Sequence, residues 1–216
     1  MTEIGLIHGG FVGMRFWHYR DRQTKHGNFA AFSDLLENGT AALHLWAQAN
    51  QSLDFWQVLD IPTIFNYYYQ ERAYTNSDTA HDRLGQFLAQ QQPRAIACHS
   101  LGCHLLLQYL NNQNPLPDRT TAIYFAQGDF DRDYVITNPA ILVRIKQGHL
   151  KIYNYYHPWD QMLLISIGAN RRVAAGLTGT TEGYFIDRFF PLITTPNLHQ
   201  SQLCSRQFKK EVMQGI

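Results

Sequence analysis

Short apolar runs that alternate with segments of helical length constrain the fold of this chain more than any other feature. Five such runs are bounded by turn residues, and they are Ile4 to Ile7, Thr63 to Tyr68, Ala95 to Cys98, Ala122 to Phe125 and Leu150 to Tyr155. Buried runs of this length with helices between them are typical of a mainly parallel sheet covered on both faces. We therefore predict an α/β fold with a mainly parallel sheet of about five to six strands.

Three segments between these runs have the apolar spacing of helices. They are Phe32 to Trp56, which is broken near Asn38-Gly39, Ser77 to Gln91, and Leu101 to Leu110. We expect two helices or one interrupted helix in the first segment, and Ser77 or Asp78 can cap the second. Gly176 to Gly183 is rich in Gly and Thr and is expected to be a surface loop that borders the site.

Size and charge limit the classes of protein to which the chain can belong. With 216 residues and 45% hydrophobic content, it is expected to form one domain over residues 1–216. The charged fraction is 16% and the formal net charge is +1, with Lys and Arg scattered along the chain. No basic stripe is present to bind a nucleic-acid backbone, so nucleic acid is not an expected partner.

The ends of the chain and its cysteines indicate the compartment. The first residues lack the basic segment of a signal peptide, and no apolar stretch reaches the roughly 20 residues that span a bilayer. Cys98, Cys103 and Cys204 form an odd set and are expected to be thiols rather than disulfides. We expect a cytoplasmic protein without an integral membrane segment.

The segment Cys98-His99-Ser100-Leu101-Gly102 lies between a buried run and the apolar helical segment. A small-x-Ser-x-small sequence in that position forms a tight turn that presents a nucleophilic serine. The N-terminal N–H groups of the following helix can stabilise an oxyanion, and Leu101 is the natural first donor. Alternatively, Ser100 only caps a helix.

A second glycine-rich turn follows the first apolar run, in His8-Gly9-Gly10-Phe11. A backbone N–H in such a turn can donate to the same oxyanion; Gly10 would be the donor, with Phe11 as the alternative. The alternative is an ordinary tight turn after a strand.

A nucleophilic serine needs a histidine base and a carboxylate that orients it. In an architecture with this serine turn, the acid follows the serine in the chain and the histidine follows the acid. Asp160, just after the last apolar run, and His199 fit that order. Asp129, Asp131 and Asp133 follow the preceding run and are alternative acids. The other nine histidines are expected to be mostly surface or turn residues.

The pairs Cys98-His99 and Cys103-His104 contain residue types that bind zinc. These pairs would diverge around the serine turn, and no second Cys/His cluster completes a site, so we expect neither a metal nor another cofactor. A thiol enzyme that uses Cys98 or Cys103 is also conceivable, but no histidine is placed in the sequence to suggest pairing with either thiol.

The serine turn, the segment Ile123 to Asp131 and the segment Tyr153 to Leu163 together resemble a small bacterial branch of the α/β-hydrolase superfamily. Cys98 replaces the glycine that usually opens the turn. The resemblance covers most of the chain and implies an α/β-hydrolase fold that lacks the first two usual strands. It also implies an Asp-x-x-Leu segment at Asp160, then a loop with Arg and Gly at Arg172 to Gly179, and a final histidine.

These features together predict a serine hydrolase that cleaves a carboxylic ester or a lipid-like acyl substrate through an acyl-enzyme intermediate. Ser100, Asp160 and His199 would be the catalytic residues, and Phe11 and Trp159 would contact a small-molecule ester or acyl substrate. An acyltransferase or thioesterase with the same triad remains an alternative, as does a binding protein that keeps the fold without catalysis.

Overall fold

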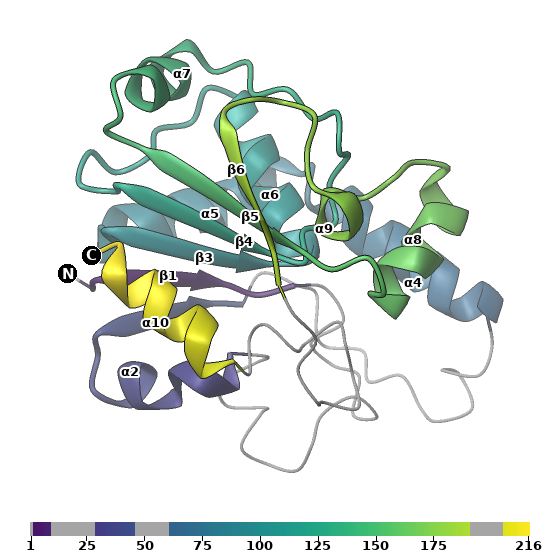
Figure 1. Ribbon diagram of the computed structural model, residues 1–216, viewed down its shortest axis with the longest axis horizontal. Coiled ribbons are helices and arrows are strands. Elements are labelled where there is room, and N and C mark those ends of the chain that lie inside the picture. The colour runs from purple at the N-terminus through teal and green to yellow at the C-terminus, as the bar shows by residue number, and fades with distance from the viewer. Residues whose placement is uncertain (1, 10–28, 46–60, 191–204) are drawn as a thin grey trace.

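Six parallel strands form the centre of the structure (Figure 1). The computed structural model of the protein describes residues 2–9, 29–45, 61–190 and 205–216. The strands are β1 (Ile4–Ile7), β2 (Ala41–His44), β3 (Ala95–His99), β4 (Ala122–Ala126), β5 (Lys151–Tyr156) and β6 (Phe185–Phe189). Their order across the sheet is β2-β1-β3-β4-β5-β6, and every neighbouring pair is parallel.

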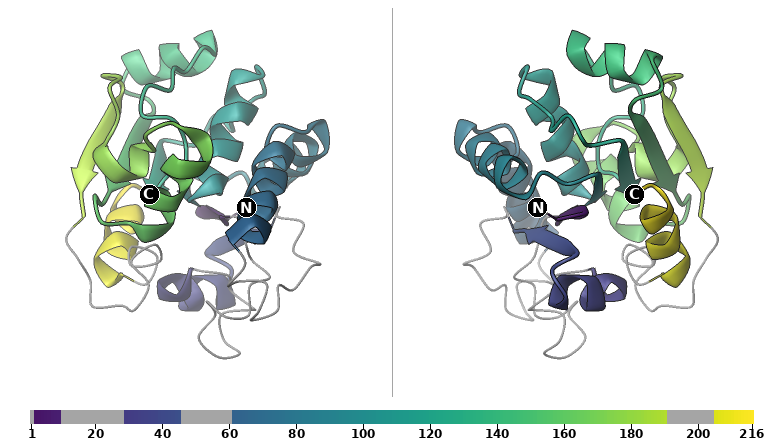
Figure 2. Two further views of the ribbon diagram at one scale, coloured as in Figure 1. Left: turned by 90° about the vertical axis from the view of Figure 1, so that its right-hand side faces the viewer. Right: turned by 90° about the vertical axis from the view of Figure 1, so that its left-hand side faces the viewer.

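Helices cover both faces of this sheet. They are η1 (Ala30–Phe32), α2 (Ser33–Glu37), α4 (Ile61–Tyr74), α5 (Asp78–Gln91), α6 (Leu101–Asn111), α7 (Pro139–Lys146), α8 (Gln161–Asn170), α9 (Ala175–Thr178) and α10 (Arg206–Gln214). In Figure 2, α5 and α6 lie on one side of the sheet, and α2 and α10 lie on the other. None of the helices in these described ranges is long and apolar enough to cross a membrane.

Two apolar layers hold the helices to the sheet, because successive side chains of a strand point to opposite faces. On β3, Ile96 and Cys98 pack in the layer under α5, α6 and α7. Ala95 and Ala97 of the same strand pack in the layer under α2 and α10. All four side chains are fully buried. The prediction of an α/β fold with a mainly parallel sheet and helices on both faces is therefore confirmed.

The direction of strand progression reverses between β1 and β3. From β1 the chain proceeds outward to β2, and it then returns to the other side of β1 to build β3, β4, β5 and β6. In doubly wound sheets, a crevice opens outside the carboxyl ends of the strands at such a reversal, and ligands bind there. The serine turn follows β3, so the fold places Ser100 at this position.

The strand predicted over Thr63 to Tyr68 is wrong, because these residues lie inside helix α4. The aromatic residues of this segment favour strands in general, and this preference misled the prediction. The buried Tyr68 and Glu71 of α4 and the buried Thr75 directly after it follow helical spacing, but Glu71 and Thr75 are polar. The apolar spacing of Ile61, Ile64, Phe65 and Tyr68 therefore stops half-way along the helix, which weakened the helical signal.

Three further expectations need correction. Within Phe32 to Trp56 only Ser33–Glu37 is α-helical in the described part, and Ala41–His44 forms the edge strand β2. The strand β6 was not predicted, because four of its five residues are exposed. The expected surface loop at Gly176 to Gly183 instead begins inside α9, whose Gly176 and Leu177 are buried.

Candidate active site

Ser100 adopts a backbone conformation that non-glycine residues rarely occupy. Its φ is 51° and its ψ is −125°, which corresponds to the glycine-favoring first central position of a type II′ turn. Such a conformation costs of the order of 1–3 kcal/mol and is concentrated at functional sites. Ser100 is the N-cap of α6, yet its side chain makes no capping hydrogen bond. The hydroxyl is therefore not engaged in the role that the simple capping alternative requires.

Three backbone hydrogen bonds fix the serine turn, two of them to β4 and the loop after it and one to the start of α6. The Ser100 N–H donates to the carbonyl oxygen of Ala126 at 3.1 Å. The Ser100 carbonyl oxygen accepts from the N–H groups of Cys103, at 3.0 Å, and Asp129, at 3.1 Å. The strained conformation is thus fixed by the end of β4 and by the start of α6.

Two glycines allow the serine turn to approach the end of β1. A Cβ on Gly102 would lie 2.3 Å from the carbonyl oxygen of His8, so no larger residue fits there. A Cβ on Gly9 would lie 3.0 Å from the Cβ of Ser100. The first turn of α6 therefore lies against the backbone that follows β1, as the serine-turn interpretation requires.

Backbone N–H groups at this position can bind a developing negative charge. Leu101 is the first residue of α6, so its N–H has no acceptor within the helix. The predicted second donor, Gly10, and its alternative Phe11 lie outside the described residues, but the preceding residues His8 and Gly9 are described. The His8 Nδ1 is 2.6 Å from the Gly9 carbonyl oxygen, which fixes the start of that turn.

Asp160 lies at the same edge of the sheet, in the connection between β5 and α8, and is fully buried. Its Oδ1 accepts hydrogen bonds from the N–H groups of Met162 and Leu163, each at 3.1 Å, and thereby caps α8. Only β4 separates β3 from β5, so the strand ends that carry Ser100 and Asp160 are about 10 Å apart.

Gln127 is a site residue that the sequence analysis did not single out. It follows β4, between the strand ends that carry Ser100 and Asp160, and its Nε2 donates to the Asp160 Oδ2 at 2.6 Å. Its backbone has a φ of 50°, which is uncommon for a non-glycine residue. Gln127 lies in the segment Ile123 to Asp131 that resembles the α/β-hydrolases, and this was the signal that could have identified it. The sequence does not show, however, that its side chain donates to Asp160.

The alternative acid Asp129 belongs to a buried polar group that we call the Asp129 cluster, namely Tyr68, Asp129, Ser166, Asn170 and Arg172. The Arg172 Nη2 lies 2.8 Å from the Asp129 Oδ1, and the Tyr68 hydroxyl donates to the Oδ2 at 2.7 Å. Burial disfavours the charged form of Asp129, but Arg172 and Tyr68 outweigh burial and hold its pKa below the usual range. Asp129 therefore carries a charge that Arg172 already balances.

The other alternative acids lie further along the same loop. The Asp133 side chain is exposed and accepts a hydrogen bond from the Thr181 hydroxyl at 2.9 Å. The Asp131 Oδ1 accepts from the backbone N–H of Asp133 at 3.3 Å. These contacts support the loop between β4 and α7.

The predicted base, His199, lies outside the described residues. The expectation that the other histidines are mostly surface or turn residues is wrong for the described part of the chain, because six of them are buried there: His8, His44, His81, His99, His104 and His157. Most of them form hydrogen bonds within the protein, and the sequence alone does not show that a histidine has such a partner.

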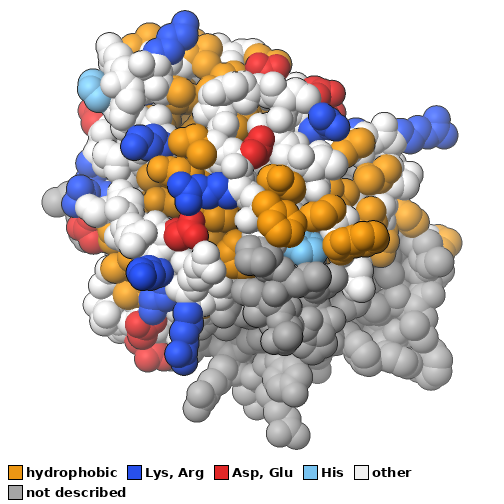
Figure 3. All heavy atoms as spheres, in the orientation of Figure 1, with side chains coloured by type: hydrophobic (Ala, Val, Ile, Leu, Met, Phe, Trp, Pro, Cys, Tyr) orange, Lys and Arg blue, Asp and Glu red, His pale blue; other side chains and the backbone are white. Residues whose placement is uncertain are grey.

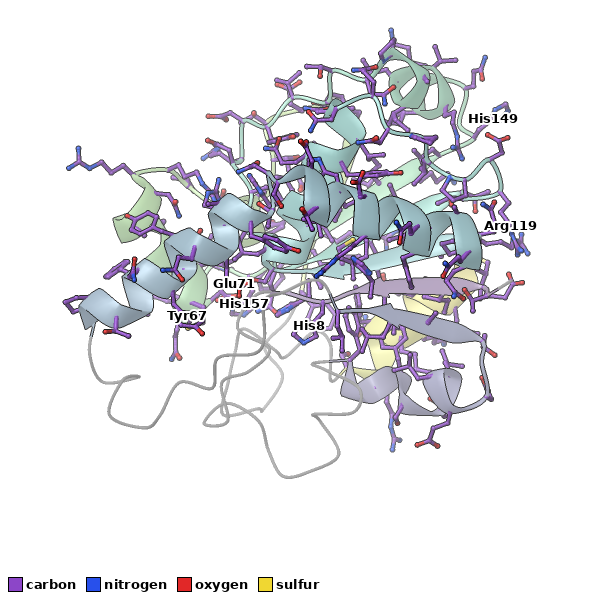
Figure 4. All side chains as sticks on the ribbon, turned by 180° about the vertical axis from the view of Figure 1, so that it is seen from behind. His8, Tyr67, Glu71, Arg119, His149 and His157 are labelled. Atoms are coloured by element: carbon purple, nitrogen blue, oxygen red, sulfur yellow. The ribbon has the colours of Figure 1, made fainter. Side chains whose placement is uncertain are left out.

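His157 lies closest in sequence to Asp160. Its Nδ1 accepts a hydrogen bond from the Trp159 N–H at 3.2 Å, and burial lowers its pKa, although Asp160 opposes this shift. Figure 4 shows His157, His8 and Glu71 at the same end of the sheet. Glu71 is almost fully buried on α4, so polar groups from helix and strand ends meet at this edge.

His104 connects α6 to α4 and must be neutral to do so. Its Nε2 accepts from the Arg72 Nη2 and the Gln108 Nε2, each at 3.3 Å. Its Nδ1 then carries the proton toward the Thr75 hydroxyl, 2.8 Å away. Burial and the charge of Arg72 lower the pKa of His104 to about 3.

The fold should therefore lose stability in mild acid. A histidine whose pKa falls from about 6.5 when unfolded to about 3 when folded stabilises the protein above pH 6.5 and loses this contribution as the pH falls. At pH 5, His104 alone should cost about 2 kcal/mol in the free energy of unfolding. Burial also lowers the pKa of His44, to about 4, which adds to the slope. Urea unfolding at several pH values between 7.5 and 5 measures this dependence of the free energy of unfolding on pH.

The matched variants are His104→Gln and His149→Gln, since His149 is exposed. The first should flatten the dependence of the unfolding free energy on pH, whatever its effect on stability at pH 7.5. The second should leave the slope unchanged, and equal slopes in the wild type and His104→Gln would contradict the assignment.

The two described cysteines are fully buried behind the serine turn. Burial raises the pKa of both the Cys98 and the Cys103 thiols well above the usual value, which disfavours a reactive thiolate at neutral pH. No group of three or more His, Cys, Asp or Glu residues that could hold a metal ion occurs within the described ranges.

Comparisons with known proteins add no relative to this picture. No family model matches the chain, and neither the curated proteins nor the solved structures contain a match. The fold and the geometry of the candidate site therefore carry the functional argument.

Proposed function

We propose that the protein is a serine hydrolase that cleaves a carboxylic ester or lipid-like acyl substrate, with Ser100 as its nucleophile. The observation that carries the proposal is the strained backbone of Ser100, combined with the absence of a side-chain capping bond. The order of the six strands and the position of the serine turn after β3 are compatible with an α/β-hydrolase fold that lacks the first two usual strands.

In the proposed reaction, the Ser100 Oγ attacks the acyl carbon while His199 takes the hydroxyl proton. The oxyanion that forms accepts hydrogen bonds from the backbone N–H groups of Leu101 and Gly10. Collapse of this intermediate breaks the ester bond, and His199 donates its proton to the departing alkoxide. Water, activated in turn by His199, then hydrolyses the acyl-enzyme and releases the carboxylic acid and free Ser100.

Asp160 is the proposed partner of His199. Asp160 accepts hydrogen bonds from three neutral amide groups, namely the N–H groups of Met162 and Leu163 and the Gln127 Nε2, and a carboxylate held in this way can stabilise an imidazolium. The charge of Asp129 is already paired with Arg172. One imidazole with its two hydrogen bonds spans about 8 Å, which suits the separation of the strand ends that carry Ser100 and Asp160.

Two isosteric substitutions separate the candidate acids. Asp160→Asn should lower ester turnover by at least about a hundredfold, because asparagine still caps α8 but cannot balance a charged base. Asp129→Asn should instead lower the free energy of unfolding by about 3–5 kcal/mol, because it leaves Arg172 buried without its counterion. Turnover and urea unfolding are measured on both variants. A stable Asp129→Asn variant without turnover would make Asp129 the acid.

A fluorophosphonate probe tests the proposed function, because covalent labelling requires an activated serine and a working oxyanion site. Intact mass should show one adduct on the wild-type protein and none on Ser100→Ala, with much slower labelling of His199→Ala. An unlabelled, folded wild-type protein that also fails to cleave acyl esters would favour a non-catalytic binding protein with this fold.

A further inference from the structure

Helix α8 carries apolar side chains on its outward side as well as on its buried side. Its buried side includes Leu163 and Ser166, and the Ser166 hydroxyl donates to Asp129. Its outward side carries Leu164 and Ile165, each of which remains 46% exposed. Surface helices normally direct their apolar residues toward the core and their polar residues outward. The outward side of α8 departs from this pattern, because Leu164 and Ile165 leave apolar surface in contact with solvent.

Two aromatic side chains extend this surface toward the candidate site. Trp159 directly precedes Asp160 and is 67% exposed, and Phe189 at the end of β6 is 57% exposed. The Phe189 ring stacks on His157 with a centroid separation of 5.9 Å. We call Trp159, Leu164, Ile165 and Phe189 the α8 face. Figure 3 shows hydrophobic side chains gathered on this side of the molecule.

We propose that the α8 face docks on the surface of a phospholipid bilayer and that the Ser100 site acts on esters held in that layer. The second part rests on the proposed hydrolase function, whereas the first does not. Asp160 caps α8, so a bilayer that contacts this helix would lie beside the site.

The size of the α8 face favours a lipid surface over a second copy of the chain. The exposed parts of four side chains amount to a few hundred Å². A stable dimer buries about 800 Å² on each partner. A bilayer needs no such area, because individual side chains insert between lipids.

The chemistry of the α8 face fits the same occupant. Residues Gln161–Asn170 include no charged side chain, so α8 carries no ionic group that would have to enter the layer. Trp159 has the apolar ring and polar N–H that suit the boundary between lipid chains and water. The exposed Arg171 directly follows α8, where its guanidinium can bind a lipid phosphate.

Vesicle flotation tests the docking surface directly. Wild-type protein should float with vesicles of phosphatidylcholine and phosphatidylglycerol, and Leu164→Ser/Ile165→Ser should partition at least about tenfold more weakly. The matched control is Val135→Ser/Val143→Ser, since these valines are 50% and 49% exposed and Val143 lies on α7, far from α8 in Figure 1. The control should float like the wild type.

Three outcomes would overturn the docking proposal. Wild-type protein that stays in solution would remove the surface altogether, and so would a Leu164→Ser/Ile165→Ser variant that floats as well as the wild type. Alternatively, light scattering could show a wild-type dimer that this variant converts to monomer, which would make the α8 face a contact between copies.

Hydrolysis separates this proposal from the proposed function. Leu164→Ser/Ile165→Ser should cleave a soluble short-chain ester at the wild-type rate, but it should cleave an ester embedded in vesicles at least about tenfold more slowly. Flotation without fluorophosphonate labelling would keep the docking surface and reject the hydrolase. Labelling with equal cleavage of the embedded ester by both proteins would keep the hydrolase and reject a bilayer substrate.

Discussion

Replacing Ser100 with alanine is expected to lower ester turnover by at least about a thousandfold, because the nucleophile that forms the acyl-enzyme is lost. The variant should not show the loss of about 1 kcal/mol in the free energy of unfolding that removal of a helix cap causes, since the hydroxyl makes no capping bond to α6. Replacing Ser100 with glycine should abolish turnover as well, but it should raise the free energy of unfolding by about 1–2 kcal/mol. Glycine adopts the φ of 51° without the strain that serine carries there.

Ser77 provides the matched control, because it caps α5 in the ordinary way. Its Oγ accepts from the Ala80 N–H at 3.2 Å. Ser77→Ala should lower the free energy of unfolding by about 1 kcal/mol and leave turnover unchanged. Urea unfolding and ester assays on the three variants check both quantities. If Ser100→Gly were less stable than the wild type, or Ser100→Ala retained turnover, the interpretation of the strained turn would be wrong.

Gly102→Ala is expected to lower the free energy of unfolding by at least about 3 kcal/mol and to abolish turnover. The added Cβ would lie 2.3 Å from the His8 carbonyl oxygen and 2.9 Å from that of Ile7. Both contacts are with backbone atoms, so no side-chain rotation relieves them, and α6 must move away from β1. That movement would displace the N–H of Leu101 from the oxyanion.

Gly168 supplies a second helical glycine for comparison. A Cβ added there meets no atom within 4 Å. Gly168→Ala should therefore raise the free energy of unfolding by about 0.5–1 kcal/mol through helix propensity alone. Thermal or urea unfolding of both variants measures the contrast, and a Gly102→Ala protein as stable as the wild type would contradict the close approach of α6 and β1.

The sequence predicted those parts of the fold in which burial and periodicity agree. Strands β1, β3 and β4 lie on continuous apolar runs, and α6 joins a turn signal to an apolar stripe. Strand β5 was also predicted, although it contains Lys151 and Asn154. The helix α5 was predicted with its cap, and the structure confirms Ser77 at that position. In each case local preference and tertiary environment favour the same conformation.

The elements that the sequence did not predict are those in which tertiary contacts override the pattern. In α4 the polar Glu71 interrupts the apolar spacing on the buried side, and the buried Tyr68 binds Asp129. The edge strand β6 is mostly exposed, and its pairing with β5 decides its conformation. At the site, the sequence identified Ser100 and Asp160 as candidates. The hydrogen bond from Gln127 to Asp160 depends on β4 lying next to β5, and local sequence patterns do not specify the order of strands in a sheet.

The two helices that cover one face of the sheet come from opposite ends of the described chain. Phe32, beside α2, meets Phe208 of α10 with ring centroids 6.1 Å apart, and Lys209 forms an ion pair with Asp34. During synthesis this apolar face stays uncovered until α10 has emerged from the ribosome. Nascent chains that stop short of α10 would thus expose a broad hydrophobic surface of the kind that chaperones bind and that promotes aggregation.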